Sequence, residues 1–502
     1  MDASPPPFSF SRSASDTNPG PASDSEMDAP TDTADTDATD ADTGAIDADA
    51  ADAGTDPFLD GAGFFPGLPS GYGDLTGRSA VVVGGAMAGL AAAHALSRAG
   101  YGVTLYERQS YADKRVNCGE AITDASLLPL AKTPDNGFPC ATTAFEVQVR
   151  DGNETESALF PAAWGYVADR NVVERRWAAH LAAEGVAVRE GSSVSRGEFG
   201  ELTDAYDLVV DATGQPSLAS RFENSTEEYV GAMTAINADV TGDFSGLHPR
   251  ALIVFEEYLG YAWCFPKTES RANVGIGWAQ EALPDDFTAA FAAACERNGW
   301  PTPDPGTANV AVIPRGPSLD PRRTYDRQGV VRVGDAAGIA NRFTGKGISQ
   351  AIHSSYLMAA LAAHDRLPEY PRRLHGTMRP EYFLSYVVRG TLEDNRLDLL
   401  RGVLRAVDGI DVESVDREPR KALARLARRP VLCARLARSP AIRRRAVRAL
   451  RDDWEYAALE PGSGTEPETG TEVETGPETD RETASGPTRS LGRRLSALRP
   501  GK

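Results

Sequence analysis

The chain has 502 residues, of which 41% are hydrophobic and 25% are charged, and its formal net charge is -20 at pH 7. This is the composition of a globular protein, and its acidity argues against nucleic acid as a partner. The sequence has neither a signal-peptide pattern nor an apolar run of the roughly 20 residues that span a bilayer. We therefore expect a soluble, cytoplasmic protein whose membrane contact, if any, is peripheral.

Low-complexity stretches lie at both termini. Residues 1–76 contain a single basic residue, Arg12, among many Asp, Thr and Ala residues, and residues 458–502 are rich in Glu, Thr, Gly and Pro. Such segments bury too little apolar surface to offset the entropy of the chain, so both are predicted to be disordered. Arginine supplies 46 of the 52 basic residues, and this lysine-poor, acidic composition indicates a high-salt cytoplasm.

The first folded segment, residues 79–108, predicts a strand, a glycine turn, an Ala-rich helix and a second strand. Gly84 can make the tight turn, Gly89 permits close packing of the helix, and Ala86 is small enough for a pyrophosphate to approach the helix N-terminus. Glu107 ends the second strand, where an acidic residue accepts hydrogen bonds from a ribose. The pattern favours FAD or NAD over NADP, and a turn without a ligand is the alternative.

The remaining elements follow in order. The sequence predicts a helix over 170–184, a β-region over 186–194, a buried strand within 206–214, alternating strands over 228–278, a late strand within 329–338, a helix over 345–363 and further helices to 457. Asp335 ends the late strand, where it can accept a hydrogen bond from a ribityl hydroxyl. The N–H groups near Gly347 and Ile348 can face the N1–C2=O edge of a flavin. An ordinary helix start with an Asp cap is the alternative, but pairing with the Gly84 turn favours FAD.

The order of the motifs, above all "CGEAI" at 118–122, "YAWCFPK" at 261–267 and "GDAAG" at 334–338 without a following His, resembles the geranylgeranyl reductase family of FAD-dependent oxidoreductases. This family lies in the group-A flavin monooxygenase-like superfamily. The resemblance covers about residues 79–365, and with the acidic composition it suggests a haloarchaeal source. It implies an α/β fold: a Rossmann-like FAD-binding domain, an interposed antiparallel β-sheet substrate domain and a helical C-terminal region.

By this resemblance the FAD-binding domain is discontinuous, with segments 77–125, 165–220 and 325–365. The substrate domain takes 126–164 and 221–324, and the helical region takes 366–457. The resemblance also implies a set of FAD-binding residues: Gly84, Ala86, Met87, Ala88, Gly89, Glu107, Cys118, Gly119, Arg170, Val194, Asp211, Gly214, Asp335, Gly347 and Ile348.

Tyr261, Trp263 and Phe265 alternate along a predicted strand and therefore share one face. They are either ordinary core residues or, as the resemblance implies, the wall of an apolar channel for an isoprenoid lipid chain. In the second case reduced FAD delivers a hydride to an isolated C=C bond, and NAD(P)H or a ferredoxin-like protein supplies the electrons. Arg342-Phe343 stands where the family tends to have Pro-Leu, which leaves the identity of the substrate open.

Cys118 is the candidate catalytic residue, with proton delivery, positioning or mere packing as its possible roles. The five cysteines, Cys118, Cys140, Cys264, Cys295 and Cys433, form no Cys-x-x-Cys pair, so we expect neither a disulfide framework nor a metal site.

Three other functions stay open. A flavin monooxygenase of this superfamily usually has a His where this chain has Gly338. A flavin-dependent halogenase needs a lysine near the flavin, and Lys267 and Lys346 are available. A lipid-binding or electron-carrier protein that merely retains FAD is the non-enzymatic alternative.

The C-terminal region has an intermittent apolar face among many arginines, formed by Leu423, Leu426, Leu432, Leu436, Ile442 and Leu450. One interpretation is a helical layer with solvated arginines. The other is a basic amphipathic surface that lies on an anionic bilayer, which would suit a lipid substrate.

Overall fold

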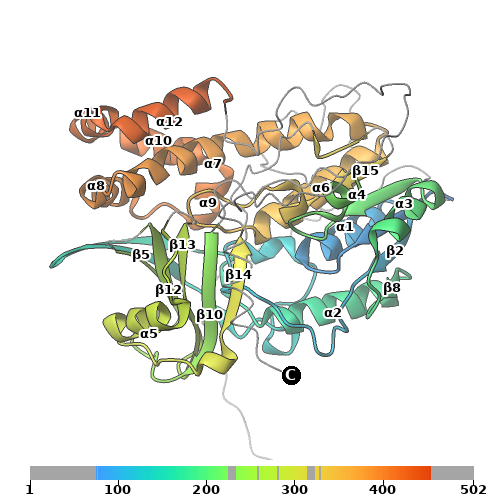
Figure 1. Cartoon of the computed structure of the whole chain (residues 1–502), viewed down its shortest axis with the longest axis horizontal. Helices are drawn as coiled ribbons and strands as arrows, with labels where there is room; N and C mark the ends of the chain where they lie inside the picture. The colour runs from blue at the N-terminus through green and yellow to red at the C-terminus, as the bar shows by residue number, and fades with distance from the viewer. Residues whose placement is uncertain are drawn as a thin grey trace, which may run out of the picture. The chain divides into compact units, whose positions relative to one another are not determined.

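The computed structural model describes residues 75, 77–223, 233–256, 259–279, 282–313, 323–326 and 329–453. The terminal stretches for which composition predicts disorder, 1–76 and 458–502, lie outside these residues apart from Leu75. Figure 1 shows the course of the chain.

A five-stranded parallel sheet forms the first layer, in the order β15-β9-β1-β2-β8. Its strands are β1 (Ser79–Val83), β2 (Gly102–Tyr106), β8 (Ala187–Arg189), β9 (Leu208–Asp211) and β15 (Val330–Arg332). β1 lies at the centre and is buried from Ala80 to Val83. A strand covered on both faces reads as a continuous apolar run, as this one does.

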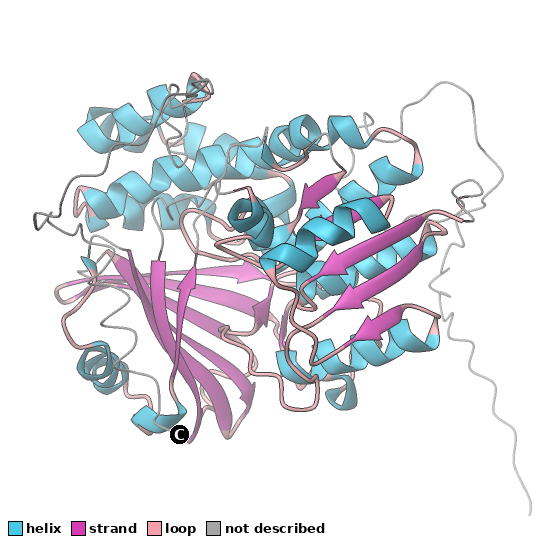
Figure 2. Cartoon of the chain, turned by 45° about the vertical axis from the view of Figure 1, so that its right-hand side comes forward, coloured by secondary structure: helices cyan, strands magenta, loops and turns pink. Residues whose placement is uncertain are grey.

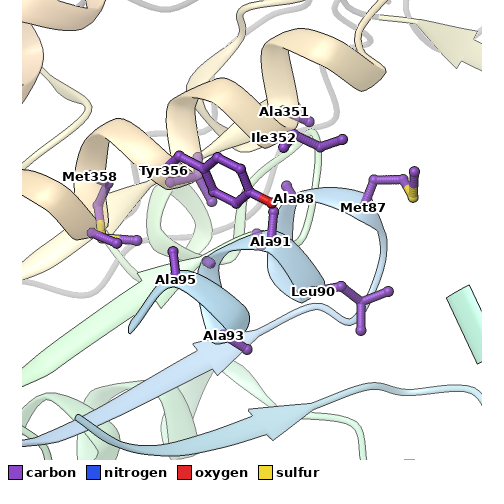
Figure 3. Packing of buried hydrophobic residues seen from close by; sticks show 14 of the residues in the cluster. Met87, Ala88, Leu90, Ala91, Ala93, Ala95, Ala351, Ile352, Tyr356 and Met358 are labelled. Carbon is purple, nitrogen blue, oxygen red and sulfur yellow. The ribbon is translucent and has the colours of Figure 1, made fainter. Parts of the chain in front are cut away.

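Two helices from distant parts of the sequence pack closely against this sheet. α1 (Met87–Arg98) is rich in buried alanines, so α6 (Ile348–Ala363) can approach it. Figure 3 shows the side chains of Ala351, Ile352 and Tyr356 on α6 beside those of Ala88 and Ala91 on α1. The Ser355 hydroxyl donates to the Ala88 carbonyl at 2.9 Å. The two motifs with which these helices begin, far apart in sequence, therefore share one core.

A seven-stranded sheet forms the second layer, in the order β14-β10-β13-β12-β11-β5-β6. Its strands are β5 (Ala144–Asp151), β6 (Glu154–Pro161), β10 (Met233–Thr241), β11 (Ala251–Phe255), β12 (Gly260–Thr268), β13 (Arg271–Ala279) and β14 (Asn309–Ile313). The pairs are antiparallel except β11 with β5, which run parallel. α5 (Phe287–Asn298) packs on one face, with Ala262 and Cys264 of β12, while Trp263 and Phe265 point to the other.

The remaining described elements before the C-terminal helices are smaller. They are the three-stranded sheet β3-β7-β4 (Ala121–Ile122, Tyr166–Val167 and Cys140–Ala141), the helices α2 (Arg170–Ala183), α3 (Arg196–Ala205) and α4 (Leu218–Phe222), and the 3₁₀ turns Ala125–Leu127, Pro134–Asn136, Pro305–Thr307, Gly334–Ala337 and Leu367–Glu369.

The C-terminal part is helical, as expected. It comprises α7 (Tyr370–Glu393), α8 (Leu397–Val407), α9 (Val412–Arg417), α10 (Pro419–Ala427), α11 (Pro430–Arg438) and α12 (Pro440–Leu450). α8 packs on β5 and β6, and Figure 2 shows these helices above the large sheet. Among the described residues, none of the helices combines the length and the apolarity that crossing a membrane requires. The predicted α/β architecture with an interposed β-sheet and a helical C-terminal region is confirmed.

Candidate active site

A cavity of about 500 Å³ opens between the two large sheets and the C-terminal helices. Its lining changes character along its length. At one end it is lined by the glycine turn before α1, by Cys118 and Gly119, and by the start of α6. At the other end it is lined by aromatic and aliphatic side chains of β5, β12, α8 and α10.

The glycine turn brings main chain close to the cavity. Gly84 has a φ of +103°, and a Cβ there would lie 2.4 Å from the Ala212 carbonyl oxygen. A Cβ on Gly89 would lie 1.7 Å from the Gly84 oxygen, so neither position admits a side chain. α1 then begins after Ala86 without a side-chain cap, and its first N–H groups are available to an anion.

A second uncapped helix start lies at the same end of the cavity. α6 begins after Gly347, again without a side-chain cap. An Asp335 carboxylate oxygen would lie 3.2 Å from a Cβ on Gly347, so the carboxylate stands beside this helix start. Burial raises the pKa of Asp335, and the charge of Arg170 opposes that rise. Two uncapped helix N-termini and a carboxylate on one cavity fit the pyrophosphate, flavin edge and ribityl chain of an FAD.

The structure gathers most of the predicted cofactor residues at this cavity, and their contacts with FAD stay predictions. The residues that line it are Ala86, Met87, Ala88, Cys118, Gly119, Arg170, Gly214, Asp335, Gly347 and Ile348. Gly84 and Gly89 form the turn beneath them.

Besides Gly84 and Gly89, three predicted cofactor residues do not line the cavity. The Glu107 carboxylate accepts hydrogen bonds from Gly85 N at 2.9 Å and Gln109 N at 2.8 Å, and pairs with Lys114 Nζ at 2.7 Å. The Asp211 carboxylate caps its own turn, with Thr213 and Ala219 as donors. Val194 packs against a cluster that includes Val81, Val83 and Phe199. Contacts of these three residues with FAD stay predictions.

Arg170 and Cys118 lie next to each other at the polar end. The Arg170 guanidinium binds Glu174 Oε1, with Nε at 2.9 Å, and its positive charge interacts with the nearby Cys118 thiol. Burial lowers the pKa of Arg170, but Glu174 and Cys118 outweigh that effect and raise the pKa overall. Glu120 N–H donates to the same sulfur at 3.2 Å. Cys118 therefore lies between a main-chain donor, Glu120 N–H, and the positive charge of Arg170.

The three alternating aromatics of β12 line the cavity; Trp263 and Phe265 are buried, and Tyr261 is partly buried. The rings of Tyr261 and Trp263 are 5.8 Å apart, and those of Trp263 and Phe265 stack at 6.1 Å. Trp263 Nε1 donates to Asn273 Oδ1 at 2.9 Å, and the Tyr261 hydroxyl donates to the Thr344 carbonyl. The core-packing and wall interpretations are therefore compatible, because the same side chains serve both.

Sequence reasoning did not identify the rest of the apolar end. Phe343 stacks on Phe255 with centroids 5.0 Å apart, at the position of the Arg342-Phe343 departure from the family. The helices add further lining residues: Val403, Leu404 and Val407 from α8, and Ala422 and Leu426 from α10. The strong apolar periodicity of α8 could have predicted a buried face, but not that this face borders a cavity.

The apolar C-terminal face divides between interior and surface. Ile442 and Leu426 are buried, and Leu432 and Leu436 pack partly against the core. Leu423 and Leu450 are exposed. The intermittent apolar face is therefore not all surface, because much of it packs within the helical layer.

The two lysines that are available to the halogenase alternative, which needs one, have different surroundings. Lys267 is 2% exposed, and its Nζ is held by Glu120, Asp169 and Asp239. Lys346 lines the cavity, with Nζ 3.9 Å from Glu381 Oε1. Burial lowers the pKa of Lys346, an effect that Glu381 opposes.

His94, His180 and Glu184 could offer metal ligands, since one ligand atom from each lies within 4.8 Å of the others. Trp177 Nε1 donates to His94 Nδ1 at 3.2 Å. An indole N–H only donates, so a neutral His94 carries its proton on Nε2, the atom that lies 3.9 Å from Glu184. A metal would need the lone pair of that nitrogen. The geometry favours a hydrogen-bonded cluster over a metal centre.

Comparison with known proteins adds evidence from sequence and fold. Residues 82–112 match the family model of the NAD(P)-binding Rossmann-like domain. A digeranylgeranylglycerophospholipid reductase of Methanothermobacter thermautotrophicus is 26% identical over 67% of this chain and 93% of its own length. One from Methanopyrus kandleri is 29% identical over 54% of this chain and 76% of its own length.

Solved structures share the fold. A geranylgeranyl bacteriochlorophyll reductase-like protein from Thermoplasma acidophilum has a TM-score of 0.54 at 17% identity, over 75% of this chain and 99% of that one. A halogenase mutant in complex with FAD has a TM-score of 0.51 at 13% identity, over 66% of this chain and 79% of that one. The sequence relatives confirm the predicted kinship and, with it, the expectation of an enzyme.

Proposed function

The chain is an FAD-dependent oxidoreductase related to the geranylgeranyl reductases, and from this premise we propose that it saturates isolated C=C bonds in the isoprenoid chains of a lipid. The observation that carries the proposal is the continuity of the cavity. A polar end suited to FAD leads without a break into an apolar end of a kind that an isoprenoid chain would fill. A small polar substrate would not need the apolar end of the cavity.

FAD, once reduced, supplies a hydride to one carbon of the double bond. The residues that would hold it are the helix starts at Ala86 and Gly347, together with Arg170 and Asp335. The absence of a cap leaves the N–H groups of these helices for the cofactor rather than for a side chain.

The protein's own part is orientation and exclusion of water. A Cβ on Gly119 would lie 3.0 Å from Trp263 Nε1 and 3.1 Å from a Phe265 ring carbon, so main chain and aromatic wall are in close contact there. The wall limits the positions that a chain can take beside the polar end, and its apolar surface keeps water from the reacting carbons.

Addition of a hydride to C=C requires a proton at the second carbon. Cys118 is the group best placed to provide it, because it lines the cavity and its sulfur accepts a hydrogen bond from Glu120 N–H beside the charged Arg170 guanidinium. Cys118→Ala should then lower turnover without loss of FAD, and Cys118→Ser should restore little, because a hydroxyl is a much weaker acid.

Access of a lipid to the cavity favours contact with a membrane surface. Leu423 of α10, next to the lining residue Ala422, is exposed, and Val431 of α11 is 75% exposed among exposed arginines. Apolar side chains beside arginines suit an anionic bilayer. Co-sedimentation of the protein with anionic vesicles, and not with zwitterionic vesicles, would support this arrangement if the double variant Leu423→Asp/Val431→Asp reduced it. Equal sedimentation of the variant would count against it.

The proposed reaction is tested by product mass. Purified, dithionite-reduced protein is incubated anaerobically with a digeranylgeranyl glycerophospholipid, and the lipid is analysed by mass spectrometry. We expect gains of two mass units per bond reduced. An added oxygen or halogen would favour the monooxygenase or halogenase, for which Lys346 is the available lysine. An unchanged lipid would favour a flavin-retaining carrier. Comparison of NAD(P)H with a reduced ferredoxin in place of dithionite identifies the class of electron donor.

A further inference from the structure

A buried lysine connects the two motifs that meet at the cavity. Lys267 closes the "YAWCFPK" segment and is 2% exposed. Its Nζ binds Glu120 Oε2, Asp169 Oδ1 at 2.9 Å and Asp239 Oδ2 at 2.8 Å. These three acceptors match the three donors of an ammonium group. Lys267 is therefore fully engaged, although it is not among the residues that line the cavity.

Glu120, the cavity-side partner of Lys267, has an unusual backbone. Its φ is +65°, and of the four non-glycine residues with positive φ in the described part of the chain it alone is buried. Such a conformation persists only where the surroundings enforce it. Both carboxylate oxygens of Glu120 are held, Oε1 by Arg170 N–H at 2.9 Å and Oε2 by Lys267.

The enforced turn aims a donor at the Cys118 thiol. Glu120 N–H points to Cys118 Sγ at 3.2 Å, and the positive charge of Arg170 interacts with the same thiol. The other titratable groups near this sulfur are the Tyr261 phenol, together with Glu174 and Asp335, both of which interact with Arg170. The Glu120 N–H is the donor whose direction depends on the turn.

The charge of Lys267 keeps the Glu120 carboxylate ionised, the form in which both of its oxygens accept hydrogen bonds. The cluster holds three carboxylates, Glu120, Asp169 and Asp239, against two cations, Lys267 and Arg271. Burial raises the pKa of Glu120, and Lys267 is the largest influence that lowers it. Without Lys267 the carboxyl group would both lose its partner and tend to protonate, which would release the turn.

We propose that Lys267 is a positioning residue that acts through Glu120: by clamping this carboxylate it holds the Cys118–Glu120 turn, directs Glu120 N–H to the Cys118 sulfur, and so sets the acidity of the thiol. The role rests on the proposed function for its purpose, the supply of a proton to the substrate. The positioning role of Lys267 requires no reaction at Asp169 or Asp239, since both carboxylates serve to neutralise the lysine.

The test measures the acidity of Cys118 directly. In flavin-loaded, full-length protein carrying Cys433→Ser, which removes the other partly exposed cysteine, the rate of alkylation of Cys118 by iodoacetamide is followed against pH by peptide mass spectrometry. We expect Lys267→Met to move the profile about one unit to higher pH, which makes alkylation about tenfold slower at neutral pH. Lys267→Arg, which retains charge and donors, should restore the original profile.

Two further variants keep the test decisive. Lys267→Met alone leaves three carboxylates with one cation, so Lys267→Met/Glu120→Gln is included, because it removes the clamp without changing the net charge of the cluster. Lys132→Met is the matched control, since Lys132 Nζ binds the carbonyls of Leu128 and Leu130 instead. An unchanged alkylation profile in the folded double variant would overturn the proposal. A shifted profile in a protein that saturates no lipid would refute the proposed function and leave the positioning role intact.

Discussion

Main-chain groups form the nucleotide end of the cavity, whereas side chains form its apolar end. The first is built from the Gly84–Gly89 turn and the uncapped starts of α1 and α6. The second draws side chains from β5, β12, α8 and α10, which are far apart in sequence. A main-chain site demands particular small residues at fixed spacing. A site made of apolar side chains demands only volume and apolarity. The two ends should therefore respond differently to substitution.

The largest effect is expected from Gly89→Ala at the nucleotide end. Its Cβ would lie 1.7 Å from the Gly84 oxygen, and main chain cannot yield there without opening the turn. We expect loss of bound FAD and destabilisation by about 3 kcal/mol, measured by flavin absorbance and by denaturant unfolding. Gly102→Ala, where the nearest atom is 3.7 Å away, is the matched control and should retain both properties. Full flavin retention by Gly89→Ala would contradict the main-chain description of this end.

The same difference between the two ends decides which parts of the fold and of the site the sequence could predict. Gly84, Gly89, Asp335 and Gly347 were recognisable because a strand followed by small residues and a helix has a local signature. The fold class followed from the same local periodicities.

The apolar end of the cavity and the Lys267–Glu120 ion pair have no such local signature in the sequence. Leu404 and Leu426 border the cavity only because α8 and α10 return over β5 and β6, which is a matter of tertiary packing. Lys267 and Glu120 are 147 residues apart, and neither motif alone suggests an ion pair. Glu107 combines both cases: its position predicts a ribose ligand, which stays a prediction, but not the ion pair with Lys114 or the hydrogen bond from Gly85 N–H that the structure shows.

A smaller effect, confined to the substrate, is expected at the apolar end. Leu404→Trp fills space next to the lining residues of α8 without touching the glycine turn. We expect unchanged flavin content and a KM for digeranylgeranyl lipid raised by about tenfold, equivalent to about 1.4 kcal/mol of binding. Arg405→Trp, at an exposed position of the same helix, is the control. If flavin were lost from Leu404→Trp, the two ends would not be separable.

The two ends should also differ in their response to acid. Burial lowers the pKa of His94 on α1 to about 4 and that of His353 on α6 to about 3, whereas α8 and α10 contain no histidine. The unfolded chain binds these protons near pH 6.5, so stability is complete above that pH and is lost as pH falls towards the folded values. Between pH 7 and pH 5 each histidine should remove about 2 kcal/mol. His94→Gln should lessen the loss by that amount in thermal unfolding at the two pH values, and an unaltered acid sensitivity would show that His94 is not its source.

The central claim, that one cavity places a lipid chain against a flavin, is tested most directly by anaerobic stopped-flow spectroscopy of the reduced protein. Addition of digeranylgeranyl glycerophospholipid should restore the absorbance of oxidised flavin, and the fully saturated lipid with the same head group should not. Flavin that stays reduced with the unsaturated lipid, or reoxidises equally with both, would contradict the account.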